Sequence, residues 1–121
     1  MPKILIIDDS PTDIHVYGKL LEKSGYEVDS APNAEEGINR AKETLPDLIL
    51  MDVIMPGMNG FQATRSLSKD PQTAHIPVII ISTKNMETDK VWGLRQGAKD
   101  YVTKPVRDSV LLQKIATALG G

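Results

Sequence analysis

Short runs of uninterrupted apolar residues are the strongest constraint that this sequence places on its fold. Four such runs are separated by longer segments of mixed polarity: Ile4–Ile7, Leu48–Met51, Val78–Ile81 and the shorter Tyr101–Val102. Continuous apolarity, rather than alternation, indicates strands that are covered on both faces, as in a parallel sheet. A fifth segment, Tyr26–Ala31, alternates apolar and polar residues and therefore predicts a half-exposed edge strand.

The segments between these runs carry helical spacing and helix-end signals. Ser10, followed by Pro11 and then Asp13, predicts a capped helix start, and Asn33 predicts a second one. Mostly apolar residues three or four positions apart predict the buried side of each helix. They are Ile14, Tyr17 and Leu21; Ala34, Ile38, Ala41 and Leu45; Phe61, Thr64 and Leu67; Val91 and Leu94; and Leu112, Ile115 and Leu119. Gly97 stands where a helix would end with a left-handed residue.

Strand and helix thus alternate five times along the chain. Right-handed crossovers then predict an α/β fold, a flavodoxin-like three-layer sandwich with five helices and a five-stranded parallel sheet of order 2-1-3-4-5. Residues 1–121 are enough for one domain, and nothing is left over for a second one.

Polar residues follow the apolar runs at the point where each predicted strand ends. The first run leads into Asp8-Asp9, the second into Asp52, the third into Ser82, and the fourth is followed by Lys104. The carboxyl ends of parallel strands lie at one edge of the sheet, and ligands bind there where the strand order reverses. We therefore expect these side chains to converge at one site.

The chemistry of this group of residues indicates phosphoryl transfer. Close carboxylates repel one another by about 1–4 kcal/mol per pair at ~4 Å, and a cation would offset that repulsion. An all-oxygen ligand set favours a hard ion, Mg²⁺ or alternatively Mn²⁺. Lys104 can pair with a phosphate oxygen and Ser82 can donate a hydrogen bond to another, so that a carboxylate of this group would act as the nucleophile that accepts the phosphoryl group.

The composition excludes several other classes of site. The chain has no cysteine, so disulfides, thiolate metal sites and thiol catalysis are excluded. A net charge of −2 without a basic cluster gives no sign of a nucleic-acid or membrane surface. No apolar run approaches the ~20 residues that span a bilayer, and the start lacks a signal peptide, so we expect a cytoplasmic protein. His15 and His75 lack metal-ligand spacing and are interpreted as surface residues.

Five motifs in this order resemble the response-regulator receiver family, and the resemblance covers essentially the whole chain. The motifs are Asp8-Asp9; Asp52 followed by Met55-Pro56-Gly57-Met58-Asn59-Gly60; Ser82; Gly97-Ala98-Lys99-Asp100-Tyr101; and Lys104-Pro105. The resemblance implies that Asp52 is the phosphoacceptor, that Asp9 binds the metal directly and that Asp8 contacts the metal through a water molecule. It also implies that the backbone carbonyl of Ile54 is a metal ligand. Gly57 and Gly60 are expected to shape the loop beside Asp52.

The same resemblance implies a switch at the other side of the site. Lys104 would pair with the phosphate, Ser82 would move its hydroxyl toward it, and Tyr101 would change rotamer with Ser82. The peptide bond between Lys104 and Pro105 would be cis. Ser82 is less usual than threonine, and Ile54 and Lys84 occupy positions that tune dephosphorylation, so the lifetime of the phosphorylated state stays open.

The resemblance also implies partners. A histidine kinase or a phosphotransfer domain would supply the phosphoryl group, and the protein would catalyse only its own phosphorylation and dephosphorylation. The chain is similar to stand-alone CheY-type receivers, in particular to those of the chemotaxis-like systems that control type IV pili. We expect no effector domain, so a monomer would bind a downstream protein through the Trp92-Tyr101-Leu112 region, without contacting nucleic acid or inserting into a membrane.

Other functions remain as alternatives at this point. The chain can be a receiver that drains phosphate from a shared kinase, or an interaction module that is never phosphorylated. An aspartate-nucleophile phosphatase would carry a second aspartate two residues after Asp52, where this chain has Ile54. A nucleotide- or flavin-binding module would need a glycine-rich loop or a Walker motif after the first strand, where this chain has Asp8-Asp9.

Overall fold

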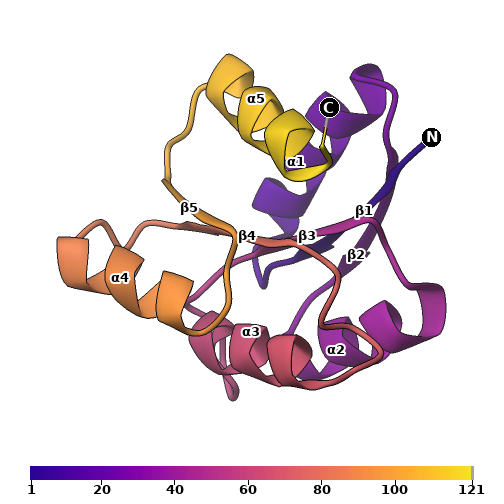
Figure 1. The fold of residues 1–121 in the computed structure, drawn as a ribbon. Coiled ribbons are helices and arrows are strands. Elements are labelled where there is room, and N and C mark those ends of the chain that lie inside the picture. Colours follow the sequence, from indigo (N-terminus) through magenta and orange to yellow (C-terminus); the bar gives the residue numbers. More distant parts are fainter. Residues whose placement is uncertain (121) are drawn as a thin grey trace.

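A parallel sheet between two layers of helices forms the protein (Figure 1). The computed structural model describes residues 1–120. The strands are β1 (Lys3–Ile7), β2 (Glu27–Ala31), β3 (Leu48–Met51), β4 (Val78–Ser82) and β5 (Asp100–Thr103). The helices are α1 (Pro11–Lys23), α2 (Ala34–Thr44), α3 (Gly60–Lys69), α4 (Glu87–Arg95) and α5 (Asp108–Ala118). The sheet order β2-β1-β3-β4-β5, with every neighbouring pair parallel, confirms the predicted topology.

Both faces of the sheet are buried, which explains the continuous apolar runs. Successive strand residues point to opposite faces, and α1 and α5 cover one face while α2, α3 and α4 cover the other (Figure 1). Leu5 and Ile7 pack in the core with α2 and α3, whereas Ile4 and Ile6 pack in the core with α1 and α5. β2 lies at the edge of the sheet and is only partly buried, as its alternating sequence predicts.

The helix ends confirm most of the predicted signals. The Ser10 side chain accepts a hydrogen bond from the Asp13 amide at 3.2 Å, and Asn33 caps α2 in the same way at 2.9 Å. Gly97, just after α4, has a φ of 111°, in the left-handed region that favours glycine. The reciprocal capping box at the start of α3, between Asn59 and Gln62, was not among the predicted signals.

The predicted buried side of α4 is wrong. Val91 and Leu94 are exposed, and the residue of α4 that is buried is Gly93. A Cβ at Gly93 would lie 2.9 Å from Ile80 and 3.0 Å from the Tyr101 ring, so the helix packs on the sheet through its backbone and its apolar side chains project outward.

The predicted stripes of two other helices also need correction at their ends. Leu45 is exposed because α2 stops at Thr44 and Leu45 is its left-handed C-cap. On α5, Leu111 is fully buried, while Leu112 and Leu119 are only partly buried. None of the helices within residues 1–120 combines the length and the apolar character that a membrane-spanning segment requires.

We predict that Gly60→Ala lowers the free energy of unfolding by about 2–3 kcal/mol, because a Cβ there would overlap the carbonyl oxygen of Asp52. The control is Gly18→Ala in α1, where the nearest heavy atom, in Val28, would lie 3.7 Å away. There we expect a gain of about 0.5–1 kcal/mol from helix propensity. Urea unfolding measures both, and equal stabilities of Gly60→Ala and wild type would contradict the close approach.

Candidate functional site

The backbone pairing of the sheet continues past the strand ends and fixes the positions of the predicted site residues. The Asp52 amide donates to the carbonyl of Ile7 at 2.9 Å, which places Asp52 beside the end of β1. On the other side, the Lys104 amide donates to the carbonyl of Ser82 at 2.8 Å. The Asp8 amide in turn donates a hydrogen bond to the carbonyl of Ala31 at 3.1 Å. The predicted convergence at the carboxyl edge of the sheet therefore rests on main-chain hydrogen bonds.

Three of the predicted residues form a compact carboxylate cluster. Asp8, Asp9 and Asp52 each offer one oxygen, and these oxygens all lie within 4.8 Å of one another. Asp8 and Asp52 are buried, with exposed fractions of 1% and 7%, whereas Asp9 is open to solvent. The donor set is entirely oxygen and negatively charged, which fits a hard divalent cation such as Mg²⁺. Ile54, two residues beyond Asp52, turns its side chain to solvent.

The cluster perturbs the acidity of Asp52. Burial and the nearby Asp8 carboxylate raise the pKa of Asp52 from 3.8 to about 6, and the Lys104 ammonium offsets only part of this rise. The ionised form of Asp52 is therefore held at a free-energy disadvantage in the folded protein. A cation placed among the three carboxylates would remove that disadvantage.

Lys104 is the cation that the structure itself provides. Its ammonium nitrogen lies 3.0 Å from an oxygen of Asp8, 3.5 Å from Asp52 and 2.7 Å from Asp13. Burial lowers the pKa of Lys104, but the hydrogen bonds to Asp13 and Asp8 outweigh it and raise the pKa above its usual range. The peptide bond between Lys104 and Pro105 is cis, as the family resemblance implies.

Asp13 is the member of this site that was not predicted from the sequence. The sequence indicates it only as an acidic residue in the first turn of a helix, and the structure places it there. The missed signal was its place in the first turn of a helix that starts directly beyond Asp8-Asp9. A side chain in that turn can reach back to the edge of the sheet where the charged residues gather.

Ser82 and Tyr101 form a second, linked arrangement at the end of β4. The hydroxyl of Ser82 accepts a hydrogen bond from the Lys84 amide at 3.2 Å, and the hydroxyl of Tyr101 donates to the Lys84 carbonyl at 2.7 Å. Tyr101 is buried rather than half-buried, because its ring fills the space that Gly93 leaves beneath α4. The backbone of Lys84 therefore connects the two residues for which a switch is predicted.

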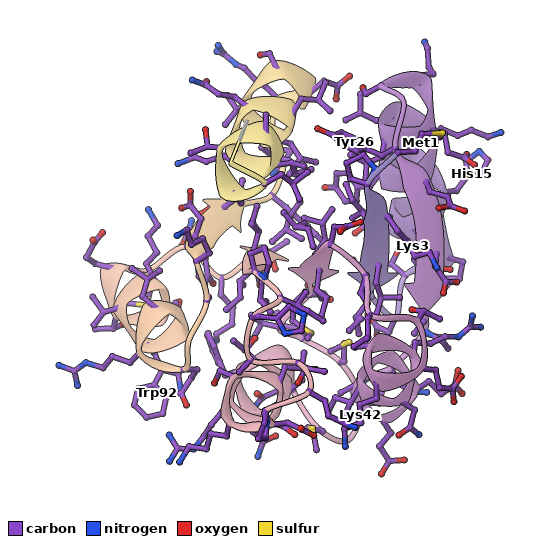
Figure 2. The ribbon with its side chains drawn as sticks, turned by 45° about the vertical axis from the view of Figure 1, so that its right-hand side comes forward. Met1, Lys3, His15, Tyr26, Lys42 and Trp92 are labelled. Atoms are coloured by element: carbon purple, nitrogen blue, oxygen red, sulfur yellow. The ribbon has the colours of Figure 1, made fainter. Side chains whose placement is uncertain are left out.

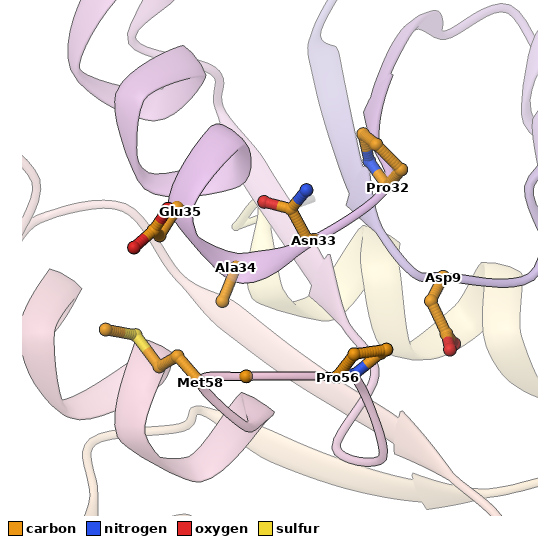
Figure 3. Close-up of a pocket in the computed structure, with 8 residues that line it drawn as sticks. Asp9, Pro32, Asn33, Ala34, Glu35, Pro56 and Met58 are labelled. Atoms are coloured by element: carbon orange, nitrogen blue, oxygen red, sulfur yellow. The ribbon is translucent and has the colours of Figure 1, made fainter.

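A groove of about 430 Å³ opens beside Asp9, the exposed member of the cluster (Figure 3). Its walls come from the start of α2, with Asn33 and Ala34, and from the loop after β3, with Pro56 and Met58.

His15 and His75 are exposed, as predicted (Figure 2 shows His15).

Comparisons with known proteins place the chain among relatives of the same family and fold. The sequence profile of the response regulator receiver domain matches residues 4–116. The chain is 54% identical over 121 residues to Protein PilH of Pseudomonas aeruginosa, a match that covers 100% of both chains. It is 39% identical over 113 residues to the response regulator PleD of Caulobacter vibrioides, which covers 93% of this chain but only 25% of PleD.

Solved structures show the same likeness. The chemotaxis protein CheY4 of Vibrio cholerae matches with a TM-score of 0.92 at 29% identity, over 98% of both chains. A CheY-like receiver domain protein from Methanospirillum hungatei matches with a TM-score of 0.92 at 30% identity, over 99% of this chain and 94% of that one.

We predict that Asp52→Asn stabilises the protein in EDTA at pH 8 by about 1–2 kcal/mol. A pKa rise of about two units corresponds to ~3 kcal/mol, which solvent screening reduces. Because the folded pKa of about 6 lies above the unfolded value, wild type loses stability as the pH rises from ~4 to ~6. The advantage of the variant should therefore be small at pH 4 and full at pH 8.

Urea unfolding at the two pH values measures this difference, with and without Mg²⁺. Added Mg²⁺ should stabilise wild type more than the variant, because it offsets the charge that the variant lacks. Asp29→Asn is the control, since Asp29 pairs with Arg40 at the surface and should show no such pattern. A variant no more stable than wild type at pH 8 in EDTA would contradict the electrostatic account.

Proposed function

The chain belongs to the response regulator receiver family of two-component systems, as its motifs predict, and on this premise we propose that it is a switch whose Asp52 accepts a phosphoryl group. The observation that carries the proposal is the placement of Asp52: a buried carboxylate between two other carboxylates and the Lys104 ammonium. The elevated pKa of Asp52 indicates a carboxylate in need of a cation, and the exposed Asp9 leaves one side of the cluster open to solvent.

The proposed transfer uses a lone pair of an Asp52 carboxylate oxygen. This oxygen attacks the phosphorus of a phosphohistidine on a histidine kinase or a phosphotransfer domain. The P–O bond of an acyl phosphate forms while the P–N bond breaks, and the imidazole keeps the electron pair and takes up a proton. Lys104, 3.5 Å from Asp52, stands where it can pair with the charge on the phosphoryl oxygens.

Mg²⁺ is the cation that we propose for the carboxylate cluster, with Mn²⁺ as a chemical substitute. Asp9 and Asp52 would bind it directly, Asp8 through water, and the backbone carbonyl of Ile54 would complete the protein ligands. When bound, the metal would neutralise charge on the phosphoryl group and on the carboxylates. No acidic group stands at Ile54, so we expect the phosphoryl group to stay on Asp52 rather than turn over as in a phosphatase.

The arrangement around Lys84 supports a route from the site to the surface. Ser82 would turn its hydroxyl toward the phosphoryl group, and Tyr101 would respond because both contact the backbone of Lys84. Tyr101 lies against α4, from which Trp92 projects into solvent with 51% exposure (Figure 2). We propose that the Trp92-Tyr101-Leu112 region binds a downstream protein.

The proposed cellular role draws on the relatives. The full-length match to PilH and the likeness to a chemotaxis protein support a chemotaxis-like pathway, which we propose controls pilus-based motility. Within it, residues 1–121 would act in the cytoplasm as one monomeric receiver domain, without an enzymatic activity of their own beyond self-phosphorylation. A receiver that drains phosphate from a shared kinase would use the same site and differ only in lacking a downstream target.

We predict that incubation with Mg²⁺ and acetyl phosphate adds one phosphoryl group, at Asp52, because the carboxylate attacks this donor as it would phosphohistidine, with acetate as the leaving group. Intact-mass measurement and peptide mapping detect the adduct. It should be absent from Asp52→Asn and from wild type in EDTA, and present in the control Asp29→Asn. An unmodified wild type would refute the proposal, and rapid consumption of donor without an adduct would indicate a phosphatase.

We also predict that phosphorylation changes the fluorescence of Trp92, the only tryptophan of the chain, because α4 contacts the Tyr101 ring through Gly93. Fluorescence is recorded in Mg²⁺ before and after acetyl phosphate. Asp52→Asn should give no change, and Ser82→Ala should give a smaller change at equal phosphorylation. An unchanged signal in fully phosphorylated wild type would show that α4 does not respond.

A further inference from the structure

A fourth carboxylate reaches the site from the first turn of α1. Asp13 approaches the Lys104 ammonium to 2.7 Å, closer than Asp8 at 3.0 Å or Asp52 at 3.5 Å. Asp13 does not belong to the three carboxylates whose oxygens converge within 4.8 Å. The proposed metal site and the proposed nucleophile therefore do not account for it, and its contact within the site is with Lys104.

The start of α1 fixes this contact. The amide of Asp13 is capped by the Ser10 hydroxyl, so the residue has a defined place in the first helical turn. One turn later on the same helix face, the ring of Tyr17 lies 5.9 Å from the Lys104 ammonium, within cation–π distance. The side of Lys104 that faces α1 is thus lined by a carboxylate and an aromatic ring.

The hydrogen bonds of the ammonium are unevenly shared. An ammonium has three N–H donors, and hydrogen bonds from Lys104 go to Asp13 and Asp8. Asp52 lies at ion-pair distance and receives no hydrogen bond from Lys104. The residue that would need Lys104 in the phosphorylated state is therefore the most weakly bound of its three partners.

We propose that Asp13 is a positioning residue that competes with the phosphoryl group for Lys104 and so limits how fully Asp52 is phosphorylated at a given donor supply. This inference rests on the proposed function, since it concerns phosphorylation of Asp52. The carboxylate of Asp13 draws the ammonium toward α1 and adds negative charge that opposes a phosphoryl dianion. If that charge is removed, Asp8 still holds the ammonium beside Asp52, so the lysine becomes more available rather than lost.

The test measures the phosphorylated fraction at steady state against acetyl phosphate concentration in Mg²⁺, by intact mass. Asp13→Asn keeps the size of the side chain and a hydrogen-bond acceptor but loses the charge. We expect its half-saturating acetyl phosphate concentration to fall about three- to tenfold, the range for a partly screened charge at this distance. Asp13→Glu keeps the negative charge, so its half-saturating acetyl phosphate concentration should lie close to that of wild type. A merely structural role of Asp13 would not produce this rescue.

Asp29→Asn is the matched control, because it removes the same charge from a surface ion pair with Arg40. It should leave the half-saturating concentration unchanged, and an equal shift in this control would overturn the inference. An unchanged or raised value in Asp13→Asn, with wild type phosphorylated, would overturn the competition and leave the proposed function intact. A wild type that is not phosphorylated at all would refute both. Urea unfolding of each variant verifies that it is folded.

Discussion

One largely buried ammonium, that of Lys104, faces more negative charge than it can neutralise, and the chemistry of the site depends on this imbalance. Lys104 has three carboxylates within 3.5 Å, while only 11% of its side chain is exposed. If all three are ionised, one positive charge meets three negative ones, and Asp9 adds another at the rim. Burial and the Asp8 carboxylate raise the pKa of Asp52, and Lys104 offsets only part of this rise. A divalent cation would neutralise the remaining negative charge, since it carries twice the charge of the Lys104 ammonium and a hard ion prefers oxygen ligands.

The sheet prevents the carboxylates from relieving their repulsion by moving apart. Asp52 is tied to β1 through the Ile7 carbonyl, and Asp8 is tied to β2 through Ala31. The core beneath them is apolar on both faces of the sheet, so a shift of either strand end would disturb close packing. The repulsion must therefore be met by a proton, by Lys104 or by a bound cation. The main-chain hydrogen bonds of the sheet therefore hold together carboxylates that repel one another.

The sequence was a reliable guide where strand periodicity and parallel pairing decide the structure, and it failed where helix orientation decides. The strand order could be predicted because strands and helices alternate along the chain. The convergence of Asp8, Asp9 and Asp52 could be predicted because they follow apolar runs whose carboxyl ends meet at one edge of a parallel sheet. The contact of Asp13 with Lys104 was missed because an acidic residue in the first turn is explained by the helix start alone, although Asp13 lies one turn before Tyr17 on the same helix face. Val91 was misplaced because apolar spacing cannot reveal a helix that packs on the sheet through glycine.

That glycine contact also explains why the site and the outer surface of α4 are physically joined. The Tyr101 ring occupies the space beneath Gly93, and the same close approach turns the apolar side chains of α4 toward solvent. The hydroxyl of Tyr101 donates a hydrogen bond to the Lys84 carbonyl, and the Lys84 amide donates one to the Ser82 hydroxyl. One short backbone segment therefore links the end of β4 to this ring. Packed interiors deform in discrete steps rather than continuously, because a side chain either fills a space or leaves it empty. If the ring left its place, α4 would lose that support, so the proposed change at Ser82 would reach the surface through packing rather than through long-range charge.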